Sequence, residues 1–253
     1  MVERRMVVKG LGALPLAAIL ADAGASRAAA ADLETVTIKL AGGRVVNAAL
    51  AKPAALPAPA VLLIHEWWGL NDQIKAMAAD LAAAGYVALA VDLMDGAVAT
   101  TPEAAKAQVA KVDETAARET LVAWIDWLRG HAFCSGKVAT LGWCFGGGWS
   151  LQASLARPVE ATVIYYGRVT DPAVKLAALK GPVLGHFATR DQYITPAMVE
   201  GFKGEMARAG KPLELHSYDA DHAFANPTGN NFHRDDAQLA WQRTLTFLAA
   251  NLK

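Results

Sequence analysis

Short apolar runs that alternate with helical segments constrain the fold of this chain more than any other feature of its sequence. Several of these runs lack the polar–apolar alternation of a half-exposed sheet, as expected for parallel strands covered on both faces. The segment 72–84 ends at Gly85, a typical helix terminator, and the stretch 102–128 carries an apolar stripe at helical spacing. Alternating strands and helices predict an α/β fold, with an open, mostly parallel twisted sheet and helices on both faces. The predicted strands span 60–64, 86–91, 137–141, 161–165, 182–187 and 213–218, and the predicted helices span 72–84, 102–128, 147–156, 172–179, 196–209 and 235–252.

A hairpin is predicted ahead of these runs. The segments 36–40 and 45–50 are rich in β-forming residues and flank two adjacent glycines. The Pro- and Ala-rich stretch 52–59 that follows is a connector, because proline cannot sit inside a strand ladder. The longer connection 94–101 is interpreted as a loop over the functional site and not as a linker between domains.

The composition excludes several classes of protein. The 253 residues carry 24 Lys+Arg and 24 Asp+Glu, so no basic surface for nucleic acid is expected. Hydrophobic residues make up 54% of the chain, which is too many for a disordered protein. The 2 cysteines are too few for a disulfide-rich scaffold or a four-cysteine zinc site. A chain of this length can bury a sizeable core.

Residues 1–30 have the layout of an export signal. A basic start with Arg4 and Arg5 is followed by an apolar run over 10–20 and by small residues that fit an A-x-A cleavage site. The twin arginines resemble the twin-arginine (Tat) signal of bacteria. We therefore expect a Tat-like signal peptide, one mature domain over 31–253, export to the periplasm and no stable membrane anchor. The alternative is an amphipathic N-terminal helix or a lipid-surface anchor.

The most informative stretch is the sequence Gly-Trp-Cys-Phe-Gly-Gly at 142–147, which joins a predicted strand to a predicted helix. It matches the strand–turn–helix elbow of G-x-S-x-G hydrolases, with cysteine in place of serine. In such a tight, strained turn, side chains at Gly142 and Gly146 would collide with the neighbouring strand and helix. The turn would place the sulfur of Cys144 at a helix N-terminus, which favours a thiolate. Cys144 is the candidate nucleophile, and the alternative is a buried structural thiol.

Two partners follow Cys144 in the order that this elbow requires, which is nucleophile, acid, histidine. Asp191 comes just after the predicted strand 182–187, and His222 comes just after 213–218. Open α/β sheets place their sites on loops at the C-terminal ends of the strands. His222 would take the thiol proton, and Asp191 would fix the tautomer of the imidazole. The sequence thus predicts a Cys–Asp–His triad.

The segment that follows the first predicted parallel strand carries the other candidate groups. Hydrolases of this type place the second oxyanion donor there. The backbone N–H groups of Trp67 and Phe145 would flank the substrate carbonyl oxygen, and each such donor is worth about 10²–10³ in rate. Glu66 is a candidate charged group of the site, and its alternative is a surface acid. If Glu66 is buried, its pKa should be raised or it should have a cationic partner.

With these motifs the sequence resembles the dienelactone hydrolase (carboxymethylenebutenolidase) family, over roughly 36–252. The resemblance implies an α/β-hydrolase sheet of about eight strands, no metal, no organic cofactor, and a small-molecule lactone or ester as substrate. It implies that Cys144 attacks the carbonyl to form an acyl-thioester, with His222 and Asp191 supporting proton transfer. It also implies that Glu66 contacts the resting thiol and helps to deprotonate it when substrate arrives. The motifs that carry the resemblance are His65-Glu66-Trp67-Trp68-Gly69, Gly142-Trp143-Cys144-Phe145-Gly146-Gly147, Tyr165-Tyr166-Gly167, Asp191 and Asp221-His222-Ala223-Phe224.

One position departs from the family pattern. Well-studied members carry an arginine four residues after the histidine, where it binds the substrate carboxylate, and this chain has Asn226 there. Asn226 can donate a hydrogen bond but carries no charge, so an uncharged or differently charged lactone or ester fits as well as dienelactone. Alternatively, Arg118, Arg168 or Arg190 compensates for the missing arginine. Trp68 and Trp143 flank catalytic positions and could wall an apolar pocket. The expected pocket residues are Trp68, Trp143, Tyr166, Phe224 and Asn226.

Other interpretations stay open at this stage. Class I glutamine amidotransferases share the G-x-C-x-G elbow, but they pair the cysteine with His-x-Glu, and His222 is followed by Ala-Phe. A non-catalytic ligand-binding protein on a hydrolase scaffold is a second alternative. Within the site, His186 competes with His222 because it lies shortly before Asp191. No disulfide is predicted, because the strand between Cys134 and Cys144 would hold them beyond the roughly 7 Å Cα limit. A monomer is expected.

Overall fold

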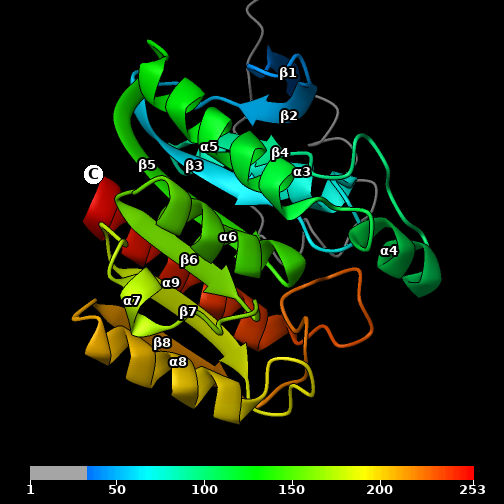
Figure 1. Cartoon of the computed structure of the whole chain (residues 1–253), viewed down its shortest axis with the longest axis vertical. Coiled ribbons are helices and arrows are strands. Elements are labelled where there is room, and N and C mark those ends of the chain that lie inside the picture. Colours follow the sequence, from blue (N-terminus) through cyan, green and yellow to red (C-terminus); the bar gives the residue numbers. More distant parts are fainter. Residues whose placement is uncertain (1–32) are drawn as a thin grey trace, which may run out of the picture.

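The computed structural model describes residues 33–253, and the predicted signal peptide at 1–30 lies outside this range. The described part contains an eight-stranded sheet in the order β1-β2-β4-β3-β5-β6-β7-β8 (Figure 1). The pairs β1–β2 and β2–β4 are antiparallel, and the other pairs are parallel. The predicted α/β-hydrolase architecture is confirmed. The strands are β1 (Glu34–Lys39), β2 (Val45–Ala51), β3 (Ala58–Ile64), β4 (Val87–Val91), β5 (Cys134–Trp143), β6 (Ala161–Tyr165), β7 (Val183–Ala188) and β8 (Leu213–Tyr218).

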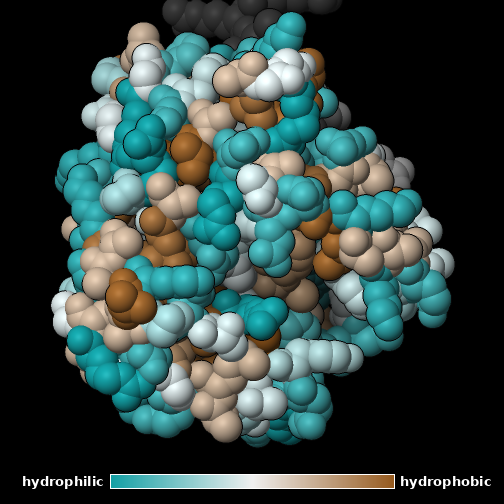
Figure 2. Space-filling view, viewed as in Figure 1, coloured by the Kyte–Doolittle hydropathy of each residue, from teal (hydrophilic) through white to brown (hydrophobic). Residues whose placement is uncertain are grey.

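Helices cover both faces of the sheet (Figure 1). The helices α3 and α9 pack on one face, and α5, α6, α7 and α8 pack on the other. Seen from the side of α5, α6 and α8, the surface is largely hydrophilic, with small scattered apolar patches (Figure 2). Within residues 33–253, every helix is too short or too polar to cross a membrane. The helices are α3 (Asp72–Ala83), α4 (Pro102–Val109), α5 (Glu114–Gly130), α6 (Phe145–Ala156), α7 (Ala173–Leu176), α8 (Pro196–Arg208) and α9 (Arg234–Leu252).

The central strand β3 shows why the apolar runs lack alternation. Val61 and Leu63 belong to the core under α3 and α9, whereas Leu62 and Ile64 belong to the core under α5 and α6. All four side chains are completely buried. A strand with helices on both faces has no solvated side, so both sets of alternate positions must be apolar.

The predicted single helix over 102–128 is wrong, because the structure has two helices in this stretch. The first, α4, ends at Val109, and α5 begins after Asp113. Asp113 adopts an extended backbone, and its carboxylate accepts the Ala116 N–H at 2.8 Å. Aspartate favours such a cap over a position inside a helix, since its side chain competes with the backbone for hydrogen bonds. The apolar stripe identified in the sequence lies entirely on α5.

The connection 94–101 lies against the segment that follows β3. The Ala99 N–H donates to the Trp68 carbonyl at 2.9 Å. Gly69 has a φ of +89°, and a Cβ there would lie 2.1 Å from the Ala97 carbonyl oxygen, so only glycine permits this approach. The predicted loop therefore covers the end of β3, next to the candidate site.

Candidate active site

Cys144 stands in the turn between β5 and α6 and is the N-cap residue of that helix. Its φ of 53° and ψ of −116° are rare for a residue with a side chain, and such strain costs about 1–3 kcal/mol. The first turn of α6 closes through the Gly147 N–H, which donates to the Cys144 carbonyl at 3.0 Å. The strained strand–turn–helix elbow expected from the sequence is therefore present.

Two glycines of the elbow let α6 approach the sheet. A Cβ on Gly142 would lie 2.0 Å from the Gly146 carbonyl oxygen. A Cβ on Gly146 would lie 2.1 Å from the Ile64 carbonyl oxygen at the end of β3. Both contacts involve backbone atoms in a close-packed interior, which cannot rotate aside. The predicted collisions are confirmed, and the approach at Gly146 brings the elbow directly beside the segment that follows β3.

The loops after β7 and β8 bring Asp191 and His222 to Cys144. His222 Nε2 lies 3.2 Å from Cys144 Sγ, and His222 Nδ1 lies 2.6 Å from Asp191 Oδ2. Asp191 Oδ1 accepts the backbone N–H groups of Tyr193 and Ile194 at 2.8 and 2.9 Å. The Asp191 side chain is fully buried, whereas that of His222 keeps 16% of its surface exposed. The structure thus joins three residues predicted from their order along the chain into one hydrogen-bonded group, here called the Cys–His–Asp row.

Hydrogen bonds along this row set the charges of its members. Burial alone would lower the pKa of His222, but the hydrogen bonds to Asp191 and Cys144 outweigh burial and raise this pKa to about 10. Burial also disfavours the charged form of Asp191, but the hydrogen bonds from His222 and two backbone N–H groups hold the pKa of Asp191 below its ordinary value. An imidazole with such a pKa keeps its proton at neutral pH.

Glu66 is buried beside the row, with 3% of its surface exposed. Its Oε1 accepts a hydrogen bond from the Tyr166 hydroxyl at 3.2 Å, and its Oε2 accepts one from the Asn226 amide. Burial raises the pKa of Glu66, although both hydrogen bonds and the charge of His222 oppose the shift. Among the described residues, Glu66 makes no hydrogen bond to the thiol, whereas the family resemblance implied a resting contact between them. The Cys144 thiol bonds to His222 instead.

The segment after β3 is anchored by a buried histidine. His65 Nδ1 lies 2.6 Å from the Glu66 carbonyl oxygen, and His65 Nε2 accepts the Leu93 N–H at 3.1 Å. Burial lowers the pKa of His65, so the ring is neutral and structural. In the described residues, the backbone N–H groups of Trp67 and Phe145 have no protein acceptor. These two groups are the predicted oxyanion donors, and that role stays a prediction.

Comparison with known proteins shows to which family this chain belongs. A family model described as the dienelactone hydrolase family matches residues 46–252. The chain belongs to the dienelactone hydrolase family. It is 30% identical to carboxymethylenebutenolidase 1 of Cupriavidus pinatubonensis, over 82% of this chain and 92% of that protein. It is 29% identical to the carboxymethylenebutenolidase of Pseudomonas putida, over 85% of this chain and 96% of that protein.

Solved structures agree on the fold of this dienelactone hydrolase family member. It is similar to a dienelactone hydrolase-like promiscuous phosphotriesterase from metagenomic libraries, with a TM-score of 0.78 and 22% identity. The similarity covers 87% of this chain and 99% of that one, and at this identity it shows the fold alone. The activity class expected from the sequence, a carboxylic ester or lactone hydrolase, is confirmed by the family and its curated relatives.

The expected pocket residues of this family member divide into three kinds. Trp68 is partly exposed next to the site. Tyr166 and Asn226 are buried, with their polar atoms on the carboxylate of Glu66. Trp143 and Phe224 are 3% and 0% exposed and pack in the core under α3 and α9. Their part in walling a substrate pocket stays a prediction.

One aromatic residue at the site was not predicted from the sequence. Tyr193 is 75% exposed, and its ring centroid lies 5.3 Å from that of His222. Its only signal in the sequence was its place two residues after the predicted acid. The competing histidine, His186, is fully buried in β7, where it hydrogen-bonds to the Tyr218 hydroxyl at 2.9 Å. His186 is thus a core residue of this protein.

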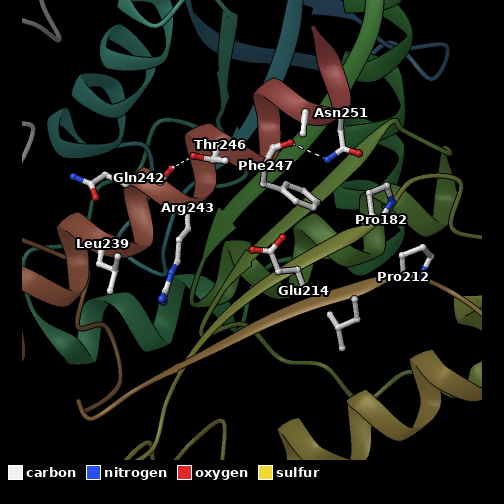
Figure 3. A pocket seen from close by; sticks show the side chains of 11 residues that line it. Pro182, Pro212, Glu214, Leu239, Gln242, Arg243, Thr246, Phe247 and Asn251 are labelled. Atoms are coloured by element: carbon white, nitrogen blue, oxygen red, sulfur yellow. Dashed lines mark hydrogen bonds between the residues drawn. The ribbon is translucent and has the colours of Figure 1, made fainter.

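The remaining polar features lie apart from the row. Cys134 and Cys144 are both free, and β5 separates them along its length. Burial raises the pKa of Cys134, which disfavours its thiolate form. Within residues 33–253, no three His, Cys, Asp or Glu side chains form a group that could hold a metal ion. A hollow of about 530 Å³ lies between α9 and β8, lined by Glu214 and Arg243 among others (Figure 3), and it includes no residue of the row.

Proposed function

We propose that this protein hydrolyses lactones or carboxylic esters with Cys144 as the nucleophile, through an acyl-thioester. The observation that carries the proposal is the Cys–His–Asp row, in which an imidazole bridges a buried carboxylate and a thiol. The sulfur also stands at a helix N-terminus, where unpaired N–H groups favour a thiolate. Partial exposure of Cys144 gives a substrate access to it.

The reaction has two halves. The Cys144 thiolate attacks the carbonyl carbon, the carbon–oxygen bond of the ester or lactone breaks, and His222 gives its proton to the departing alkoxide. A water molecule then loses a proton to His222 and attacks the thioester carbon. The carbon–sulfur bond breaks, which releases the acid and restores the thiolate beside a protonated imidazole. Asp191 orients the ring and stabilises its cationic form in both halves.

The neighbouring groups have supporting roles in the proposal. The N–H groups of Trp67 and Phe145 receive the oxyanion, and the close approach of Gly146 to β3 holds the two donors near each other. Each donor is worth about 10²–10³ in rate. A reaction that starts from a neutral Cys144 thiol would need Glu66 as proton acceptor, and for this its carboxylate must leave the bonds to Tyr166 and Asn226.

The test is turnover of p-nitrophenyl acetate by the wild type and by single variants. We expect Cys144→Ala and His222→Ala to lose activity by at least about 10³, whereas Cys134→Ala, which removes the other free thiol, should retain it. Acid quenching of the wild type during turnover should trap an acetyl group on the peptide that contains Cys144. Full activity in Cys144→Ala would overturn the proposal. Failure of the wild type on a broad ester and lactone panel would favour the ligand-binding alternative.

We further propose that residues 1–30 are a Tat-like signal and that the mature domain, 31–253, acts in the periplasm. The support is the order of the N-terminal segment: twin arginines, a short apolar run and small residues. In this proposal the mature protein is a monomer that binds a small molecule, without nucleic acid and without a stable membrane anchor. Sequencing the N-terminus of exported protein should find a start near Ala31, and an intact Met1 would refute cleavage. Light scattering checks the monomer.

A further inference from the structure

The buried charges beside the nucleophile are not balanced by cations. In the described part of the chain, His222 is the only cationic side chain that bonds within the row, and Asp191 already pairs with it. Glu66 has no ion-pair partner among these residues, because both of its carboxyl oxygens bond to the neutral groups of Tyr166 and Asn226. With the Cys144 thiolate of the proposed function counted as well, the acidic groups of the site outnumber its one cation, His222.

Asn226 is fixed in this arrangement by its own neighbours. Its side-chain oxygen accepts the backbone N–H of Thr228 at 2.9 Å and the hydroxyl of Thr228 at 2.7 Å. These bonds turn the amide nitrogen toward Glu66, and only 3% of Asn226 is exposed. An uncharged donor therefore holds the buried carboxylate in place without neutralising it.

The loop that carries His222 adds further negative charge. Asp219 and Asp221 both lie on this loop, and both pair with a single cation, Arg190. Arg190 is therefore engaged by two carboxylates, and the three side chains together leave one net negative charge. Arg190 thus does not offer an unpaired positive charge next to His222.

We propose that the site selects esters and lactones whose acyl part is uncharged, with Glu66, held by Asn226, as the residue that rejects anionic acyl groups. The inference rests on the proposed function. A substrate carboxylate that enters the site either meets the charge of Glu66 or forces a proton onto it, and both outcomes weaken binding. It also loses its hydration, and the neutral groups of Tyr166 and Asn226 bring no positive charge to compensate.

The test compares two substrates that share a leaving group and a similar acyl length, p-nitrophenyl butyrate and mono-p-nitrophenyl succinate, after subtraction of spontaneous hydrolysis. We expect kcat/KM of the wild type to be at least about tenfold higher for butyrate, given the cost of placing like charges together. Equal values or a preference for succinate would overturn the inference. Turnover of neither ester would refute the proposed function instead. This comparison needs no variant, so it does not depend on whether a mutant folds.

A matched pair of variants then tests Glu66 itself. Glu66→Gln removes the buried charge and should reduce the butyrate-to-succinate ratio by at least about fivefold. The ratio is informative even where catalysis is slower, because a loss common to both esters cancels. Glu34→Gln, which removes an exposed carboxylate on the edge strand β1, is the control and should leave the ratio unchanged. An unchanged ratio in Glu66→Gln would show that Glu66 is not the selecting residue.

Discussion

Replacing Gly146 by alanine tests how backbone packing supports this site. The new Cβ would lie 2.1 Å from the Ile64 carbonyl oxygen and 2.5 Å from that of His65. An unstrained carbon–oxygen contact is about 3.3 Å, so the start of α6 and the end of β3 must separate by roughly 1 Å. The atoms on the other side belong to backbone, so a rotamer change cannot relieve the contact.

The displacement predicts two measurable losses. Overpacking costs about 1–3 kcal/mol, and more where backbone moves, while the better helix propensity of alanine returns up to about 1 kcal/mol. We therefore expect Gly146→Ala to lower the free energy of unfolding by about 2 kcal/mol. The same shift moves the Phe145 N–H away from that of Trp67, and a misplacement of about 1 Å can reduce the rate about 10²-fold.

The matched control is Gly148→Ala in the same turn of α6. A Cβ there would lie 3.5 Å from the backbone nitrogen and oxygen of Arg168, which is an ordinary contact. This variant should keep its activity and unfold at an equal or higher urea concentration than the wild type. The assays are urea unfolding and kcat/KM on p-nitrophenyl acetate. If Gly146→Ala behaves like Gly148→Ala in both assays, the reasoning from the close approach is refuted.

Three further predictions concern the polar groups of the site. Burial raises the pKa of Glu66 above 4.5, so its ionisation opposes folding at every pH above that value. The melting temperature of Glu66→Gln minus that of the wild type should therefore increase from pH 4 to pH 8. A difference that stays constant with pH would contradict this. Asp191→Asn removes the strongest hydrogen bond that raises the pKa of His222. An NMR titration of the variant should therefore find the pKa of His222 well below about 10. An unchanged pKa would count against the proposed row. His65→Ala leaves a cavity and removes the acceptor of the Leu93 N–H. Urea unfolding should therefore show a free energy of unfolding about 2–4 kcal/mol lower than in the wild type. A midpoint equal to that of the wild type would disprove the anchoring role.

Local patterns predicted most of the fold but not its interruptions. The runs 60–64 and 161–165 became buried strands, because a strand between two helix layers must be apolar on both sides. The break before Asp113 was not predicted, because the apolar stripe of α5 dominates the pattern of that stretch. An aspartate N-cap favours a new helix start by only about 1 kcal/mol. A preference of that size is not visible in a stretch whose apolar residues already follow a helical period.

The candidate triad could be predicted because its signals are also local. The elbow around Cys144 is a local feature, since its glycines reflect the close approach of the following helix. Asp191 and His222 follow strands whose C-terminal ends meet at one edge of a parallel sheet, so their order along the chain implies their proximity. That Trp143 and Phe224 pack in the core was not evident from the sequence, because adjacency to a candidate catalytic position does not say to which side a side chain turns.

The sequence by itself determined the layered α/β sheet, the strained elbow and the order of the candidate nucleophile, acid and base, because periodicity, glycine spacing and strand ends are properties of neighbouring residues. Only the tertiary structure decided what faces Glu66. Its partners, Tyr166 and Asn226, lie 100 and 160 positions away along the chain. Their meeting depends on how distant loops converge above the sheet, which no local pattern encodes. The proposed selection of uncharged acyl groups therefore depends on tertiary packing.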